Sequence, residues 1–167
     1  MSANPDHTVF PRAGFFRRVG AWVYDLLAIT AILMLASGLA LAFVAILVAS
    51  NLVTLPADTD HASVLEGNLL FQAYLIAVVF WFFAGFWVRG GQTIGMRAWR
   101  MKVQNTDGSG ISWKQATIRL LLAAFGLSNI GVLFSREKLG WHDRVAGCEV
   151  IELSAEANKL RNWRRLK

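Results

Sequence analysis

Cysteine is nearly absent from this sequence of 167 residues, which contains only Cys148. A single cysteine cannot form an intrachain disulfide, so the chain does not belong to the small secreted proteins that disulfides hold together. Charged residues are also scarce, at 17% of the chain, where about 25% is typical of soluble domains. This composition excludes a disordered or highly solvated chain.

Apolar residues are present in large excess. When glycine is counted and tyrosine left out, as in the usual apolar set, they make up about 62% of the chain, against roughly 45–50% in soluble domains. The length is close to one ~150-residue folding unit. We therefore expect a single domain that is an all-α integral membrane protein.

Two long uncharged runs predict two transmembrane helices. Residues 26–49 and 69–88 contain 24 and 20 residues without a charge, and a 30 Å hydrocarbon core requires about 20. We place these helices at about 17–50 and 69–88. Basic residues precede the first run as in a signal peptide, but the run is longer than the 7–15 residues of a cleaved one, so we expect an uncleaved anchor.

The charges beside these runs predict the orientation of the chain. The loop between them contains three acidic residues and no lysine or arginine. The stretch after the second run contains five basic residues, namely Arg89, Arg97, Arg100, Lys102 and Lys114. The positive-inside rule then places the N-terminus and this stretch in the cytoplasm.

A third apolar segment, at about 112–134, contains Arg119 and an internal break at residues 126–129. A simple crossing would carry the basic C-terminal part to the outside, against the charge rule. We therefore favour a broken, re-entrant helical hairpin, and a plain third span remains the alternative.

Two short segments predict strands on the cytoplasmic side. Residues 99–103 alternate apolar and polar side chains, and the turn-forming residues 105–110 follow. Residues 148–153 are rich in β-branched side chains. We expect these segments to pair as a small cytoplasmic β-strand pair.

Ionisable residues in the apolar segments are the candidate functional residues. Arg18 and Asp25 share a helix face, but they lie about 10.5 Å apart along the axis and Arg18 leans toward the N-terminus. Arg119 is therefore our favoured partner for Asp25, since an unpaired carboxylate there is costly. The carboxylate either belongs to an ion, proton or ligand path or forms a structural ion pair that fixes helix packing, and both alternatives stay open.

Four sequence motifs resemble those of the RDD family of membrane proteins. These are Arg18-Val-Gly-Ala-Trp-Val-Tyr-Asp25, Gly91-Gln-Thr-Ile-Gly95, Met101-Lys-Val103 before Asp107-Gly108, and His142-Asp-Arg-Val-Ala-Gly147 before Val150. The resemblance extends over most of residues 12–152. The family is named for one arginine and two aspartates, which correspond here to Arg18, Asp25 and Asp143.

The resemblance implies a small multi-pass protein of the bacterial cytoplasmic (inner) membrane. The resemblance implies an undefined biochemical role, and transport of an ion or other ligand has been proposed for the family. Two positions depart from the family pattern, because Met96 replaces a usual lysine and Cys148 a usual threonine. We take residues 1–153 as the RDD-like membrane domain and residues 154–167 as a basic cytoplasmic tail.

The pair His142-Asp143 does not predict an enzyme, because no motif places a serine or cysteine nucleophile beside it. We expect Asp143 to accept backbone N–H bonds or to pair with Arg144 or Arg97. The three histidines fall in separate segments, so no metal site is expected. The sequence indicates no cofactor.

The basic residues lie beside apolar runs, which favours anionic lipid headgroups over nucleic acid as a partner. Five tail residues are candidates for contact with the lipid surface: Lys159, Arg161, Trp163, Arg164 and Arg165. A frayed, solvated tail is the alternative. Small residues at Gly38 and Ala42, and at Ala73 and Ala77, fit helix packing within one chain or in a homo-oligomer.

We expect a membrane protein that transports ions or small solutes, with Asp25 as the titrating or binding group, and the resemblance to the RDD family suggests cation/proton exchange. The alternative is a non-transporting assembly or scaffold subunit whose charged residues lock helix packing. The expected partners are the lipid bilayer and further copies of the chain.

Overall fold

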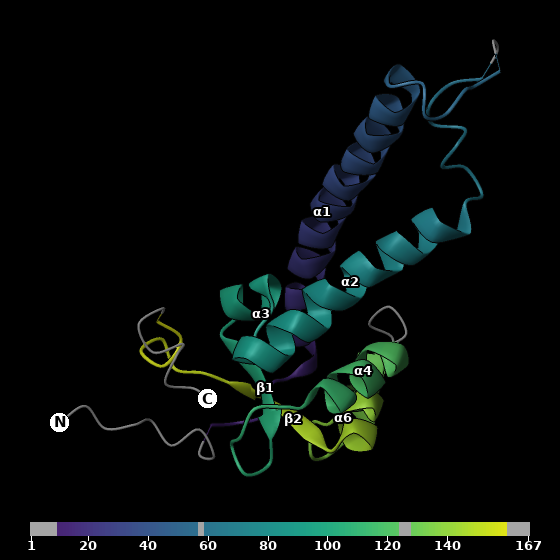
Figure 1. The fold of residues 1–167 in the computed structure, drawn as a ribbon. Helices are drawn as coiled ribbons and strands as arrows, with labels where there is room; N and C mark the ends of the chain where they lie inside the picture. Colours follow the sequence, from purple (N-terminus) through teal and green to yellow (C-terminus); the bar gives the residue numbers. More distant parts are fainter. Residues whose placement is uncertain (1–9, 57–58, 124–127, 160–167) are drawn as a thin grey trace. The chain divides into compact units, whose positions relative to one another are not determined.

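The computed structural model describes residues 10–56, 59–123 and 128–159. Its elements, in chain order, are α1 (Phe15–Ala49), α2 (Leu69–Gly90), α3 (Ile94–Ala98), β1 (Met101–Asn105), α4 (Trp113–Leu122), α5 (Gly131–Phe134), α6 (Trp141–Ala146) and β2 (Cys148–Glu152) (Figure 1). The chain divides into two compact units. One contains the residues up to Leu27 and those from Phe80 onward, and the other contains Ala28–Val79.

Helices α1 and α2 are the longest elements, with 35 and 22 residues. At 1.5 Å per residue they measure about 52 and 33 Å, and both are long and apolar enough to cross a membrane. Within the unit Ala28–Val79, the Tyr74 hydroxyl donates a hydrogen bond to the Ala36 carbonyl at 3.4 Å. The two helices predicted from the uncharged runs are confirmed, with ends that differ by one or two residues.

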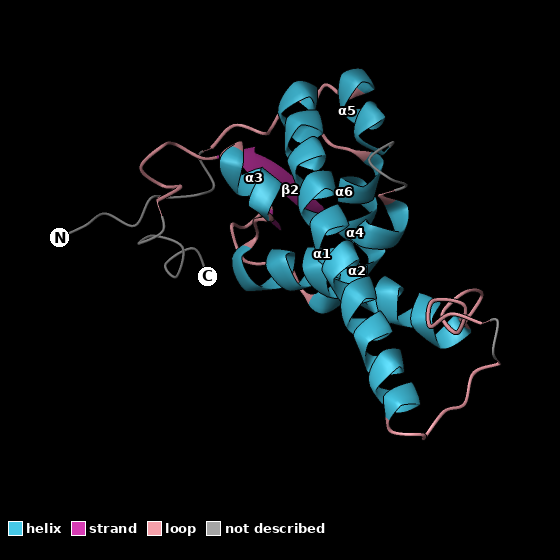
Figure 2. Ribbon diagram, turned by 90° about the horizontal axis from the view of Figure 1, so that it is seen from above, coloured by secondary structure: helices cyan, strands magenta, loops and turns pink. Residues whose placement is uncertain are grey.

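The two strands form an antiparallel sheet in the other unit. Figure 2 shows β2 as a magenta arrow. Val103 lies opposite Val150, and the register runs from Met101 with Glu152 to Asn105 with Cys148. The chain before α1 adds to the edge of β2, where the Ala13 amide donates to the Val150 carbonyl at 2.8 Å. The predicted strand pair is therefore confirmed.

The hydrophobic core of this unit lies against the sheet. Its buried side chains include Val103 and Val150 from the strands, Trp87 from α2 and Ala116 from α4. Gly91 follows α2 with φ +69°, and a Cβ there would come within 2.6 Å of the Val103 carbonyl oxygen. Glycine lets the chain turn from α2 and accept the Val103 amide at 2.7 Å.

The third apolar segment is divided between two short helices. A capping box in which Ser112 and Gln115 bond each other starts α4. Gln115 also donates to the Ala146 carbonyl at 3.0 Å, which fastens α4 to α6. Helix α4 ends at Leu122 after 10 residues, and α5 contains 4. Residues 124–127, which include part of the predicted break, lie outside the described residues, so the re-entrant hairpin and the alternative of a plain third span both stay predictions.

Candidate functional site

Asp143 lies at the centre of a buried polar cluster in the unit that contains the sheet. It occupies the first turn of α6 and accepts a hydrogen bond from the Gly140 amide at 3.0 Å. Gly147, with φ +66°, ends the helix in the left-handed region. The local sequence thus holds Asp143 in a short helix whose dipole favours a negative charge at this end.

Two arginines from distant segments contact the Asp143 carboxylate. Arg18 of α1 donates from Nη1 to Oδ2 at 2.5 Å, and Arg119 of α4 donates from Nη1 to Oδ1. Both guanidinium groups are buried. The carboxylate therefore joins α1, α4 and α6 through two charge-assisted contacts.

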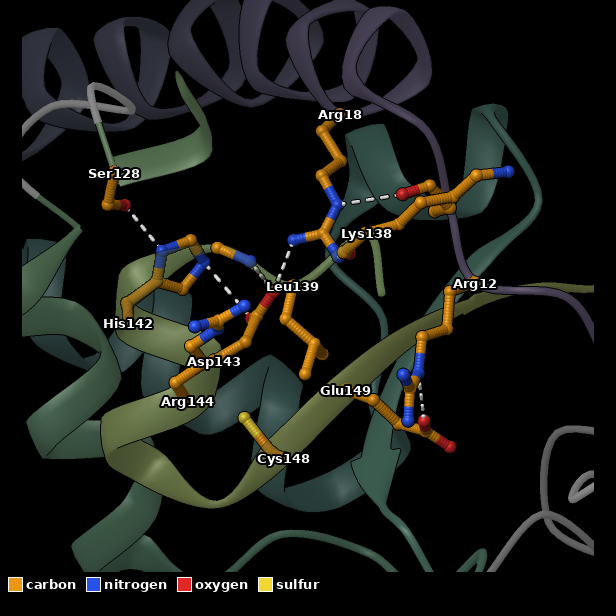
Figure 3. Close-up of polar contacts among 12 residues, drawn as sticks. Arg12, Arg18, Ser128, Lys138, Leu139, His142, Asp143, Arg144, Cys148 and Glu149 are labelled. Atoms are coloured by element: carbon orange, nitrogen blue, oxygen red, sulfur yellow. Dashed lines mark hydrogen bonds and ion pairs between the residues drawn. The ribbon is translucent and has the colours of Figure 1, made fainter. Parts of the chain in front are cut away.

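Arg18 makes further contacts that fix its guanidinium group (Figure 3). Its Nε donates to the Ala13 carbonyl and its Nη2 to the Lys138 carbonyl, each at 3.1 Å. The three guanidinium nitrogens thus have different acceptors. This geometry uses the planar donor array of arginine, which lysine lacks.

The charges around Asp143 and Cys148, together with burial, determine whether each of these two groups holds a proton. Burial alone would raise the pKa of Asp143, but Arg119 and Arg18 outweigh it and hold the pKa well below its ordinary value. Burial raises the pKa of the Cys148 thiol. With Cys148 protonated and Asp143 ionised, the two arginines leave the cluster with one excess positive charge.

A serine and a histidine extend the cluster beyond Asp143. His142 Nε2 lies 3.2 Å from Asp143 Oδ1, and Ser128 Oγ contacts His142 Nδ1 (Figure 3). Burial, together with Arg119, lowers the pKa of His142 to about 3. A neutral imidazole that donates from Nε2 and accepts at Nδ1 fits these contacts.

Ser128, His142 and Asp143 are the residue types of a hydrolase triad, yet their properties favour a structural hydrogen-bond chain. An imidazole with a pKa of about 3 is a weak general base near neutral pH. Ser128 is 3% exposed, and its single hydroxyl proton has two acceptors within reach, His142 Nδ1 and the Ala123 carbonyl oxygen at 3.1 Å. The hydroxyl is thus oriented by protein groups on both sides.

Besides Asp143, Arg119 lies against an aromatic ring and a thiol. Its guanidinium carbon lies 5.0 Å from the ring centroid of Trp87, and its Nη1 lies 3.4 Å from Cys148 Sγ. Within the described part of the chain, Arg119 Nε and Trp87 Nε1 are buried without a hydrogen-bond partner. Arg119 is therefore held by one carboxylate and an aromatic face.

Asp25 forms a separate site with the loop before α3 and its first turn. Its Oδ2 accepts from the Thr93 hydroxyl at 2.5 Å, and its Oδ1 accepts from the Gly95 amide at 2.8 Å. Thr93 is also the N-cap of α3, because its Oγ1 accepts from the Met96 amide at 3.2 Å. The Asp25 carboxylate thus fastens α3 to α1 through neutral donors.

Helices α1 and α3 approach closely because position 95 is glycine. A Cβ at Gly95 would overlap the Ala21 carbonyl and come within 2.9 Å of the Asp25 carboxyl carbon. The close approach lets the Gly95 amide reach the carboxylate. The Gly91–Gly95 motif therefore has a local role in docking α3 on α1.

Comparison with protein families places the chain in one family. The model of the RDD family matches residues 12–147, which is most of the chain. The chain belongs to the RDD family. A search of curated proteins and a search of solved structures gave no match. Family membership and the two long apolar helices point to a membrane protein.

Of the three positions that correspond to the name of the RDD family, Arg18 and Asp143 lie in contact and Asp25 lies in a separate site. The expected pair of Asp25 with Arg119 is wrong, because Arg119 binds Asp143 and neutral groups bind Asp25. The direction predicted for Arg18, away from Asp25, is confirmed.

The backbone N–H bond predicted for Asp143 is confirmed by Gly140. Its expected pairing with Arg144 or Arg97 is wrong, since its arginine partners are Arg18 and Arg119. Sequence reasoning missed Ser128, Thr93 and the Gly95 amide as partners. Thr93 and Gly95 stood in a recognised motif, whereas no local signal pointed to Ser128.

The proposed lipid-contact residues of the tail fall almost wholly beyond the described residues, which end at Lys159. Lys159 pairs with Glu156, and the nearby Asn158 accepts from Gln92 at 2.9 Å. The other four candidates, namely Arg161, Trp163, Arg164 and Arg165, lie outside the described residues. Their contact with lipid stays a prediction.

Proposed function

We propose that this RDD protein is a multi-pass protein of the bacterial inner membrane with a cytoplasmic N-terminus. We further propose that it transports an ion or small solute, as in cation/proton exchange, with Asp25 as the group that binds the proton or cation. The orientation is supported by the charge distribution, because the loop after α1 is acidic and the segments beside α2 and α3 are basic.

The observation that carries this proposal is the environment of Asp25. The residue is 4% exposed and belongs to the apolar helix α1. Its partners are a hydroxyl and an amide, and no cationic side chain contacts it among the described residues. An ionised carboxylate in such surroundings is costly unless a proton or a cation neutralises it.

Two membrane helices enclose little space, so the proposed path requires more than one copy of the chain. The small residues Gly38 and Ala42 lie four positions apart on one face of α1, a spacing that permits close helix contact. We propose a homo-oligomer whose copies together enclose the path. The bilayer and its anionic headgroups are the other partners.

Replacing Asp25 tests the proposal directly. Asp25→Asn keeps the size of the side chain and removes its charge. In proteoliposomes under an imposed pH gradient, cation flux should fall to the level of empty vesicles while the protein stays folded. Asp107→Asn, in an exposed turn, is the matched control and should keep full flux. Unchanged flux in Asp25→Asn would exclude Asp25 from the mechanism.

A second candidate function rests on a different observation. Asp143 is bound by two buried arginines from separate helices, an arrangement suited to locking helices together. On this basis the protein is a non-transporting assembly subunit. It would show no flux for any monovalent cation in proteoliposomes, and Asp25→Asn would lower only its melting temperature.

A further inference from the structure

Helices α4, α5 and α6 expose large apolar side chains. Leu121 is 76% exposed, Phe134 85%, Trp141 71% and Val145 65%. Trp141 and Val145 are four residues apart and share one face of α6. The opposite faces of α4 and α6 hold the buried Asp143 cluster. A soluble monomer seldom exposes so many large apolar groups on three short helices.

These helices are too short to cross a bilayer. Helix α4 measures about 15 Å from its 10 residues, half of a ~30 Å hydrocarbon core. Helices α5 and α6 contain 4 and 6 residues. An apolar face on such short helices can enter the boundary between headgroups and acyl chains without leaving backbone groups unpaired.

The charges beside this face indicate which surface covers it. The exposed charged residues between Trp113 and Ala146 are four basic and one acidic: Lys114, Arg136, Lys138, Arg144 and Glu137. A second copy docked symmetrically on this face would bring like charges together. Anionic lipid headgroups complement them.

We infer that the apolar face of α4, α5 and α6 lies in the interface of an anionic bilayer, with the four basic side chains at headgroup level. The segment is then an interfacial layer and not a re-entrant hairpin. This inference rests on the membrane location in the proposed function and is independent of transport. It also places the Asp143 cluster directly beneath the lipid surface.

Spin labels at single cysteines test this assignment. A Cys148→Ser background removes the native thiol, and Phe134→Cys or Val145→Cys then introduces one label each. The proteins are reconstituted in nanodiscs of phosphatidylcholine with phosphatidylglycerol. Collision with oxygen, which partitions into lipid, is compared with collision with a water-soluble nickel chelate. Leu39→Cys on α1 and Thr106→Cys in the exposed turn are the lipid and water references.

Both test labels should show the high oxygen-to-nickel ratio of Leu39→Cys, which is the reverse of the ratio at Thr106→Cys. A ratio like that of Thr106→Cys would place the face in water and overturn the inference. Low access to both reagents would indicate cover by protein and would also overturn it. A water-like ratio at Leu39→Cys itself would instead refute the membrane location.

The composition of the bilayer tests the role of the basic side chains. In nanodiscs of phosphatidylcholine alone, nickel access at both test labels should increase, because the attraction to anionic headgroups is lost. Equal access in the two bilayers would overturn the assignment of these side chains to anionic lipid.

Discussion

Asp143 and Asp25 are both buried, yet their carboxylates are stabilised by different means. Asp143 is bound by two arginines that reach it from α1 and α4. Asp25 is bound by one hydroxyl and one amide of the α3 region. The first site neutralises its charge with an excess of cations, whereas the second provides only dipoles. A buried aspartate in this chain thus binds two cationic side chains at one site and, among the described residues, only neutral donors at the other.

The comparison also separates the elements that each site holds. Asp143 links α1, α4 and α6, whose partners lie far apart in the sequence. Asp25 links α1 to the short helix α3 alone. We therefore expect changes at Asp143 to affect the whole unit and changes at Asp25 to affect mainly α3.

The largest effect is expected for Asp143→Asn. The substitution leaves Arg18 and Arg119 buried without a countercharge, which should lower the free energy of unfolding by about 3–5 kcal/mol. Denaturant unfolding in detergent, followed by circular dichroism, measures the loss. Asp60→Asn, at an exposed site, is the control. Adding Arg119→Met should restore part of the stability, and additive losses would contradict the proposed coupling.

Acidification should destabilise the Asp143 site through its neighbour His142. The pKa of His142 is lowered from 6.5 to about 3 by burial and by Arg119, so below pH 6.5 the unfolded chain binds a proton that the folded chain does not. Stability should be full above pH 6.5 and fall by up to about 1.4 kcal/mol per pH unit between pH 6.5 and 5.

The variant His142→Gln isolates this contribution. Glutamine stays neutral and can still donate to Asp143 and accept from Ser128. Its unfolding free energy should fall less steeply between pH 6.5 and 5 than that of the unmodified protein. His61→Gln, in the exposed loop, should keep the original slope. An unchanged slope in His142→Gln would show that His142 does not carry the pH dependence.

A smaller loss is expected at the Asp25 site from Gly95→Ala. The added methyl group would overlap the Ala21 carbonyl, and overpacking of this kind costs about 1–3 kcal/mol. Gly110→Ala is the matched control, because a Cβ there meets no atom within 4 Å. Thermal unfolding in detergent compares the two variants. Equal melting temperatures would contradict the close packing of α3 on α1.

The sequence predicted the elements well because their signals are local. An uncharged run long enough for a bilayer and an alternating pattern need no knowledge of distant residues. The partners of the two aspartates were not predictable in this way. Arg18 and Asp143 are 125 positions apart, and only the packing of α6 beside the start of α1 brings them together.

The error at Asp25 has a specific physical cause. Counting charges favoured Arg119 as its partner, although neutral donors can also satisfy a carboxylate. Lys102 shows the same limit of charge counting, since it was counted among the basic residues after the second run but is 1% exposed in β1. Burial lowers the pKa of Lys102 to about 8. Which polar groups become buried depends on tertiary packing that composition does not encode.

The smallest effect is expected for Thr93→Val, which removes a hydroxyl and keeps the shape of the side chain. The Met96 amide loses its N-cap acceptor and Asp25 loses one donor, so the free energy of unfolding should fall by about 1 kcal/mol. Thr93→Ser keeps the hydroxyl, so its free energy of unfolding should fall less than that of Thr93→Val. The Thr93 hydroxyl is one of the two neutral donors that contact the Asp25 carboxylate. Thr93→Val should therefore also shift the pH dependence of cation flux in proteoliposomes. A loss of stability as large as that of Asp143→Asn would show that the two aspartates share one structural role.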